Sequence, residues 1–160
     1  MTLERAAIHE SGHAVVAEAL GLTVDAIEIT PGRGETYLRN YPESRETALM
    51  LLAGYAAEAR YDGEEFSLVG HLGSDDYVRA HDLLIFKLGL TGRILIDVRD
   101  ATVILVEGLW PQITKLAEAG SAGAERIPLE GNRSDRPPAK VKPASGKSKS
   151  AALIELSRWD

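Results

Sequence analysis

Hydrophobic and polar positions along the first 120 residues mostly follow the spacing of an α-helix. Apolar residues lie on nearly every side of residues 3–20, which predicts a buried helix. Further helical patterns cover 44–61 and 75–88. The last pattern runs from 92 to 119, where many β-branched residues would also suit a strand, but its length and spacing favour a helix that bends or restarts at Pro111.

Short strands are indicated directly after the first predicted helix. Apolar and polar residues alternate over 24–30, which predicts a strand, and 31–34 has the composition of a turn. A second strand is expected at 36–40. The fold class that follows is mainly α, a compact helical domain with a small β-hairpin or edge strands after the first helix.

Charge divides the chain into two parts. Residues 1–130 carry 11 Lys and Arg against 21 Asp and Glu, a net charge of −10, which argues against nucleic-acid binding by the folded domain. Residues 131–150 carry +5 and are rich in Pro, Ser, Lys and Gly. We interpret 131–160 as a flexible basic tail with a short terminal helix at 151–159. A solubilising tail is favoured over a tether for nucleic acid or an acidic partner.

Length and composition describe one small domain. The 160 residues suffice for a single core, and no apolar run approaches the length of a membrane span. The first residues contain no hydrophobic signal segment, and the chain has no cysteine. We therefore expect a cytoplasmic protein without a membrane partner.

The first predicted helix contains the sequence HESGH at residues 9–13. His9 and His13, four residues apart, project from the same side of a helix and can bind one Zn²⁺ at roughly 2.0–2.1 Å. Glu10 would lie beside the metal, where it can take a proton from an activated water. Core helices rarely contain such residues unless a metal or partner compensates their burial.

A catalytic zinc needs a third protein ligand and an open position for water. Since the chain has no cysteine, the candidates are the remaining histidines and the carboxylates. His71 and His81 are favoured as structural or surface residues. Asp75 and Asp76 follow Ser74, a good N-cap residue, in the first turn of the third predicted helix.

Helical phase separates these two acids. Asp76 shares its face with the apolar residues Ala80 and Leu83, so Asp76 is expected to point inward and Asp75 outward. In the second predicted helix, the small residues at 53–57 are explained by close packing of helices. Glu58 follows them, and it either supports a zinc-bound imidazole or, as we favour, pairs with a surface arginine.

Four blocks, in this order and spacing, resemble the peptidase domain of the FtsH-type ATP-dependent zinc metalloproteases. The resemblance extends from about residue 3 to 87 and more weakly to 119. The family commonly has asparagine where this chain has Asp75. The blocks are HESGHAVV at 9–16, IEITPGRG at 27–34, AGYAAEA at 53–59, and GSDD at 73–76 followed by Ala80.

The resemblance implies one Zn²⁺ per chain, bound by His9, His13 and Asp76, with Glu10 as the general base. It also implies that the segment 34–38 pairs with the substrate as an edge strand, although an ordinary hairpin edge explains it equally well. The family joins this domain to an AAA+ ATPase module and a membrane anchor. Only eight residues precede His9, and no phosphate-binding loop is present, so we expect neither module here.

The sequence therefore predicts a zinc-dependent endopeptidase that hydrolyses unfolded or extended polypeptides without ATP, alone or with a separate ATPase or adaptor partner. One alternative is a non-catalytic regulatory or binding protein on the same fold. A second alternative is a zinc hydrolase acting on a small amide substrate, which only the shape of the pocket would distinguish.

Overall fold

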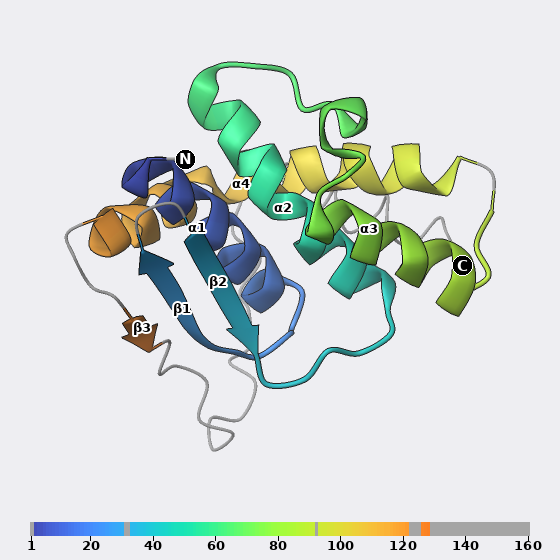
Figure 1. The fold of residues 1–160 in the computed structure, drawn as a ribbon, viewed down its shortest axis with the longest axis horizontal. Helices are drawn as coiled ribbons and strands as arrows, with labels where there is room; N and C mark the ends of the chain where they lie inside the picture. The colour runs from blue at the N-terminus through green and yellow to red at the C-terminus, as the bar shows by residue number, and fades with distance from the viewer. Residues whose placement is uncertain (1, 31–32, 92, 122–125, 129–160) are drawn as a thin grey trace, which may run out of the picture.

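The computed structural model describes residues 2–30, 33–91, 93–121 and 126–128. This part of the chain is mainly helical, with one small antiparallel sheet (Figure 1), so the predicted fold class is confirmed at that level. The predicted basic tail at 131–160 and its short terminal helix lie outside the described residues.

Three long helices form the core: α1 (Leu3–Ala19), α2 (Arg45–Asp62) and α4 (Ile94–Ser121). Each of them packs against the other two, with α1 also in contact with the sheet. A Cβ atom on Gly12 would lie 2.8 Å from the carbonyl oxygen of Ala53, so the backbones of α1 and α2 approach closely at this point. The bounds of α1 and α2 agree with the predicted helices to within one residue.

Helix α4 passes through Pro111 without a break, so the predicted restart there is not observed. Proline removes only one backbone hydrogen bond, and the apolar face of α4 on both sides of it packs against α1 and α2. Burial of Val106, Leu109 and Ile113 on this face keeps the helix continuous.

The sheet has the order β2-β1-β3, with β1 (Val24–Thr30) between β2 (Arg33–Leu38) and β3 (Arg126–Pro128). The prediction for β1 is confirmed, and a second strand is present as predicted, but it covers 33–38 instead of 36–40. Pairing with β1 continues to the tight end of the hairpin, where Thr30 is opposite Arg33, so β2 begins three residues earlier. Strand β3 was not predicted from the sequence.

Helix α3 (Asp75–Asp82) continues into a π-helical turn (Leu83–Lys87). The two segments together cover nearly all of the predicted helix at 75–88. The hydroxyl of Ser74 accepts a hydrogen bond from the backbone N–H of Tyr77 and caps the first turn. Helix α3 packs on α2, and Asp76 in its capped first turn lies 3.3 Å from His9 and His13 on α1.

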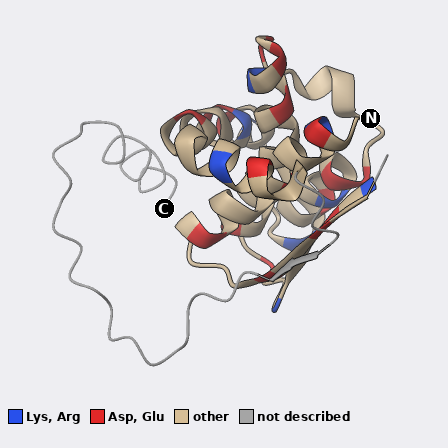
Figure 2. Ribbon diagram, turned by 90° about the vertical axis from the view of Figure 1, so that its left-hand side faces the viewer, with Lys and Arg blue, Asp and Glu red and all other residues tan. Residues whose placement is uncertain are grey.

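Basic and acidic positions are interspersed over the ribbon in Figure 2 rather than separated into two faces. Within the described ranges, no helix combines the length and apolar character needed to cross a bilayer.

Candidate metal centre

Helix α1 places His9 and His13 one turn apart on its buried side, as the motif predicts. Their side chains are almost entirely enclosed, with 7% and 4% of each residue exposed. The two Nε2 atoms lie 2.9 Å apart and face the same point between α1, α2 and α3.

Asp76 on α3 completes a group of three side chains around that point. Its Oδ2 atom lies 3.3 Å from Nε2 of His9 and 3.3 Å from Nε2 of His13. Within the described ranges, His9, His13 and Asp76 form a group with the composition and spacing of a metal site. Asp75 lies on the exposed side of α3 at the mouth of the cleft and is not a member of this group.

Hydrogen bonds on the far side of each ring define which nitrogen is free. The Nδ1 atom of His13 lies 2.7 Å from the carbonyl oxygen of Met50, which can only accept, so Nδ1 carries the proton. The Nδ1 atom of His9 donates in the same way to Glu58, at 2.5 Å. In their neutral form the two rings would therefore direct their Nε2 lone pairs, together with the Asp76 carboxylate, at one point.

Three electron-rich atoms so arranged repel one another unless a proton or a metal cation lies between them. With bonds of 2.0–2.1 Å, the ligands of a tetrahedral zinc ion are separated by about 3.3 Å. The two distances from Asp76 equal this value, and the distance between the imidazoles is slightly shorter. The residues present therefore fit a zinc ion with three protein ligands and one open position.

Gly54 on α2 forms the floor of this centre, a role that the sequence analysis missed because it explained residues 53–57 by packing alone. A Cβ atom on Gly54 would lie 2.5 Å from Nε2 of His13 and 2.6 Å from Nε2 of His9. Any side chain at this position would therefore displace both rings. A glycine in the middle of a helix, where it weakens the helix, was the available signal.

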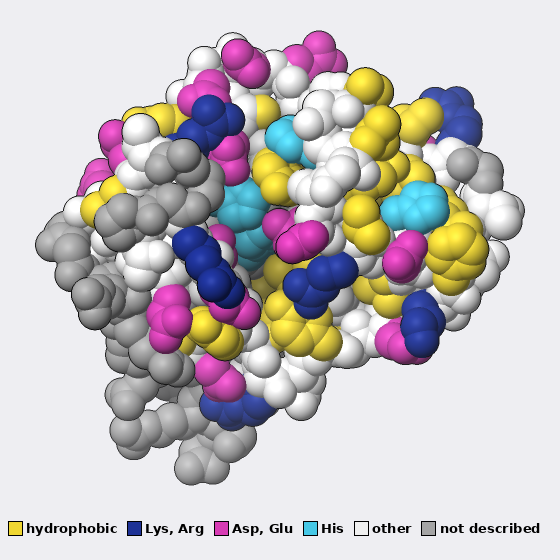
Figure 3. Space-filling view, viewed as in Figure 1, with side chains coloured by type: hydrophobic (Ala, Val, Ile, Leu, Met, Phe, Trp, Pro, Cys, Tyr) yellow, Lys and Arg dark blue, Asp and Glu magenta, His cyan; other side chains and the backbone are white. Residues whose placement is uncertain are grey.

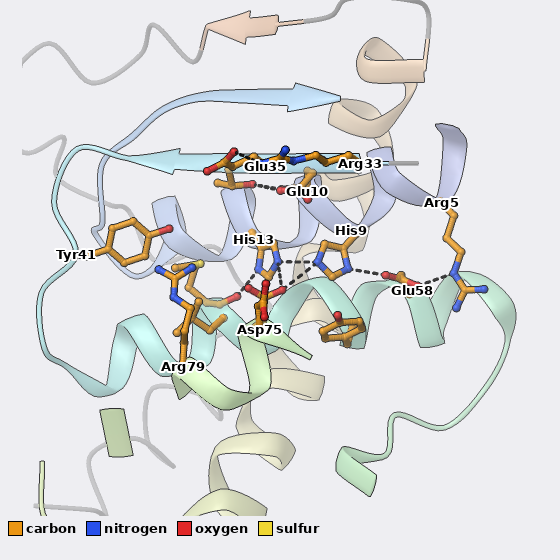
Figure 4. Close-up of a pocket in the computed structure, with 16 residues that line it drawn as sticks. Arg5, His9, Glu10, His13, Arg33, Glu35, Tyr41, Glu58, Asp75 and Arg79 are labelled. Carbon is orange, nitrogen blue, oxygen red and sulfur yellow. Dashed lines mark hydrogen bonds and ion pairs between the residues drawn. The ribbon is translucent and has the colours of Figure 1, made fainter. Parts of the chain in front are cut away.

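Glu58 on α2 makes both of the contacts that the sequence left as alternatives, one with the imidazole of His9 and one with a surface arginine, Arg5. One carboxylate oxygen accepts the Nδ1 proton of His9, and the other accepts a hydrogen bond from the Arg5 guanidinium at 2.5 Å. Arg5 also pairs with Asp62 at 3.0 Å. The result is a continuous chain of charged groups behind His9 (Figure 4).

These contacts shift the pKa values of the ionisable groups. Burial would lower the pKa of His9, but hydrogen bonds to Asp76 and Glu58 outweigh it and raise the pKa to about 9. Burial would raise the pKa of Asp76 and of Glu58. Hydrogen bonds from His13 and His9 hold the pKa of Asp76 far below its usual range, and those from His9 and Arg5 lower the pKa of Glu58.

Glu10 lies beside the three-residue group and is 4% exposed. Its Oε2 atom accepts a hydrogen bond of 2.7 Å from the hydroxyl of Thr36 on β2. Gly34, two residues earlier on the same strand, also lies directly against the Glu10 side chain. The position of Glu10 agrees with the prediction, but its contact with Thr36 was not predicted, because that contact depends on how β2 packs against α1.

All four predicted site residues line one open cleft of about 670 Å³. In the space-filling view of Figure 3, histidine side chains are visible at the bottom of a hollow, between acidic and basic side chains. Residues 33–36 of β2 form one wall, and Asp75, Asp76 and Arg79 of α3 form the other.

The other two histidines do not join the group. His71 stacks on Tyr55, with 4.0 Å between ring centroids, and Tyr55 in turn meets the ring of His9 edge-on at 4.7 Å. His71 therefore packs behind Tyr55, which lines the cleft. His81 lies near Phe86 on the outer side of α3. Both positions agree with the structural roles expected from the sequence.

Neither a family model nor a curated protein sequence matches this chain. The resemblance to FtsH-type peptidases therefore depends on the four blocks of residues quoted above.

Proposed function

We propose that this protein is a zinc-dependent endopeptidase. The observation that carries the proposal is the convergence of two imidazole Nε2 atoms and one carboxylate on a single point beside a buried glutamate, at the bottom of an open cleft. A structural zinc site would normally be closed by a fourth protein ligand and would not need Glu10.

Zinc held by His9, His13 and Asp76 would polarise a peptide carbonyl and acidify a water molecule at its open position. Glu10 then takes the proton of the attacking water and passes it to the leaving amine. Glu58 and the carbonyl of Met50 keep the two imidazoles in the tautomer that has Nε2 free.

The shape of the cleft favours a polypeptide over a small amide as substrate. β2 is an edge strand, and the backbone edge that faces away from β1 has no strand partner among the described residues. Residues 33–36 of this strand line the cleft, so an extended peptide can pair with β2 while it passes the metal centre. Backbone pairing gives a grip that depends little on the substrate's sequence.

A metal analysis combined with a cleavage assay tests this function. Zinc-reconstituted protein should contain about one zinc per chain, and His9→Ala or His13→Ala should remove most of it. Glu10→Gln should retain zinc and lose cleavage of an unstructured protein, because an amide cannot take a proton. Glu18→Gln, an exposed position on the same helix, is the matched control and should retain both. Cleavage by Glu10→Gln at the wild-type rate would exclude Glu10 as the base.

An edge-strand grip also restricts the state of the substrate. Extracting a segment from a stable domain costs much of that domain's folding free energy, roughly 5–15 kcal/mol. We therefore expect slow, ATP-independent cleavage of an unfolded substrate and almost none of the same protein in its native form. Equal cleavage of the two forms would instead indicate a dedicated docking site or an unfolding partner.

A further inference from the structure

Strand β2 contributes two neighbours to Glu10, and both lie on the same face of the strand. Gly34 and Thr36 are two residues apart, which places them on the side of the sheet that faces α1. A Cβ atom on Gly34 would collide with Cγ of Glu10 and would lie 2.6 Å from its Oε1 atom. Glu10 therefore occupies the space that a side chain at residue 34 would need.

The hydroxyl of Thr36 has two acceptors within reach, both on Glu10. It lies 2.7 Å from Oε2 and 3.2 Å from the backbone carbonyl oxygen. A hydroxyl donates one proton, and the shorter distance and the negative charge both favour the carboxylate. Only 8% of Thr36 and 4% of Glu10 is exposed, so water competes poorly for this bond.

We propose that Thr36 is a positioning residue that fixes the orientation of the Glu10 carboxylate for the proposed reaction. The terminal torsion of a glutamate is broad, and a free carboxylate would sample many orientations. The bond from Thr36 holds Oε2, and the gap at Gly34 accommodates Oε1. Among the described residues Oε1 has no hydrogen-bond donor, so this oxygen is the one available to take a proton. The expected effect on the rate rests on the proposed function. The expected effect on the orientation of Glu10 rests only on the hydrogen bond from Thr36.

Because of where Thr36 lies, loss of its hydroxyl should affect the rate of the reaction and not the binding of substrate. Its side chain is turned toward Glu10, whereas an extended substrate would pair with the backbone edge of β2. Loss of the hydroxyl should therefore lower kcat and leave KM nearly unchanged. A residue that only supports the fold would not produce this separation.

The kinetic test compares Thr36→Val, which keeps the shape but loses the hydroxyl, with Thr36→Ser, which keeps the hydroxyl. With an extended peptide as substrate, Thr36→Val should lower kcat about tenfold, and Thr36→Ser should stay within about twofold of wild type. Zinc content should remain at one per chain in both. Thr102→Val is the matched control, since Thr102 is a buried threonine of α4 outside the cleft.

Equal kcat values for Thr36→Val and wild type would overturn the proposal, as would a loss of kcat in Thr36→Ser as large as in Thr36→Val. If Thr36→Val does not fold, Thr36→Ala against Thr36→Ser makes the same comparison of a missing and a retained hydroxyl.

A second test does not depend on activity. Thermal unfolding of metal-free Thr36→Val, Glu10→Ala and the double variant measures the coupling between the two side chains. If the hydroxyl bonds the carboxylate, the double variant should lose less Tm than the two single variants predict together. Additive Tm losses would overturn the proposal. If the wild type binds zinc but cleaves nothing, the proposed function fails while this cycle still decides whether Thr36 holds Glu10.

Discussion

The two histidines of the motif are held in different ways. Behind His9 lies a chain of charged side chains, Glu58 and then Arg5, that continues to the surface. Behind His13 lies the backbone carbonyl of Met50 in the middle of α2. One ring is therefore oriented by side chains that mutation can change, and the other by the main chain of a buried helix.

The candidate metal centre therefore has an adjustable end at His9, which is oriented by side chains, and a fixed end at His13, which is oriented by the backbone. A carboxylate partner raises the basicity of the imidazole that it supports, whereas a neutral carbonyl mainly sets its orientation. We expect substitutions behind His9 to tune metal affinity and those behind His13 to have little effect unless they disturb α2.

Gly54→Ala should have the largest effect, because its new Cβ atom would meet Nε2 of both rings. We expect zinc binding to be abolished while the helical content is retained, since alanine favours a helix. Zinc titration and circular dichroism check this result. Gly108→Ala on α4, where a Cβ atom would meet no atom within 4 Å, is the control and should bind zinc normally. Normal zinc affinity in Gly54→Ala would show that the rings have room to move.

Glu58→Gln should lower zinc affinity by about 10–100-fold, the usual cost of removing an outer partner of a metal ligand. Met50→Leu keeps the carbonyl that His13 uses and should change affinity by less than about threefold. Competition with a chelator measures both. A larger loss of zinc affinity in Met50→Leu than in Glu58→Gln would instead make His13 the adjustable end.

The smallest expected effect is a pH dependence of stability and of zinc affinity, which arises from the titration of His9. The pKa of His9 is raised from 6.5 to about 9, so in metal-free protein the ring carries a proton at neutral pH. That proton stabilises the metal-free fold below pH 6.5, and its contribution is lost as the pH rises through about 9.

Zinc binding has the opposite sign, because the metal requires the unprotonated ring. Zinc affinity should rise about tenfold per pH unit from neutral pH up to about 9, where His9 loses its proton. Chelator competition across this range measures the slope. Glu58→Gln removes one cause of the raised pKa, so its affinity should level off at a lower pH. A pH-independent affinity in wild type would contradict the raised pKa of His9.

Local sequence patterns predicted the parts of the centre that depend on one helix. The four-residue spacing of His9 and His13 and the helical phase of Asp76 describe directions within a helix, which the sequence determines by itself. The structure brings these three side chains together. Whether they bind zinc remains a prediction.

The features that sequence reasoning missed all depend on how two elements meet. Gly54 faces both rings because of the way α1 crosses α2, and Thr36 reaches Glu10 because of the register of β2. The early start of β2 at Arg33 has the same origin, since pairing with β1 overrides the turn composition of residues 31–34. Tertiary packing of this kind leaves no periodic signal in one sequence.

The close contact at Gly12 has a consequence for protein design. Gly12 occupies one of the two unspecified positions of the pentapeptide, and its missing side chain allows α1 to lie against the carbonyl of Ala53, next to Gly54. Transplanting HESGH onto another helix would supply the two histidines and the glutamate. It would not supply the close contact between α1 and α2 that places Gly54 beneath the two rings. The transferable unit is a pair of helices with matched small residues, so a graft should include both.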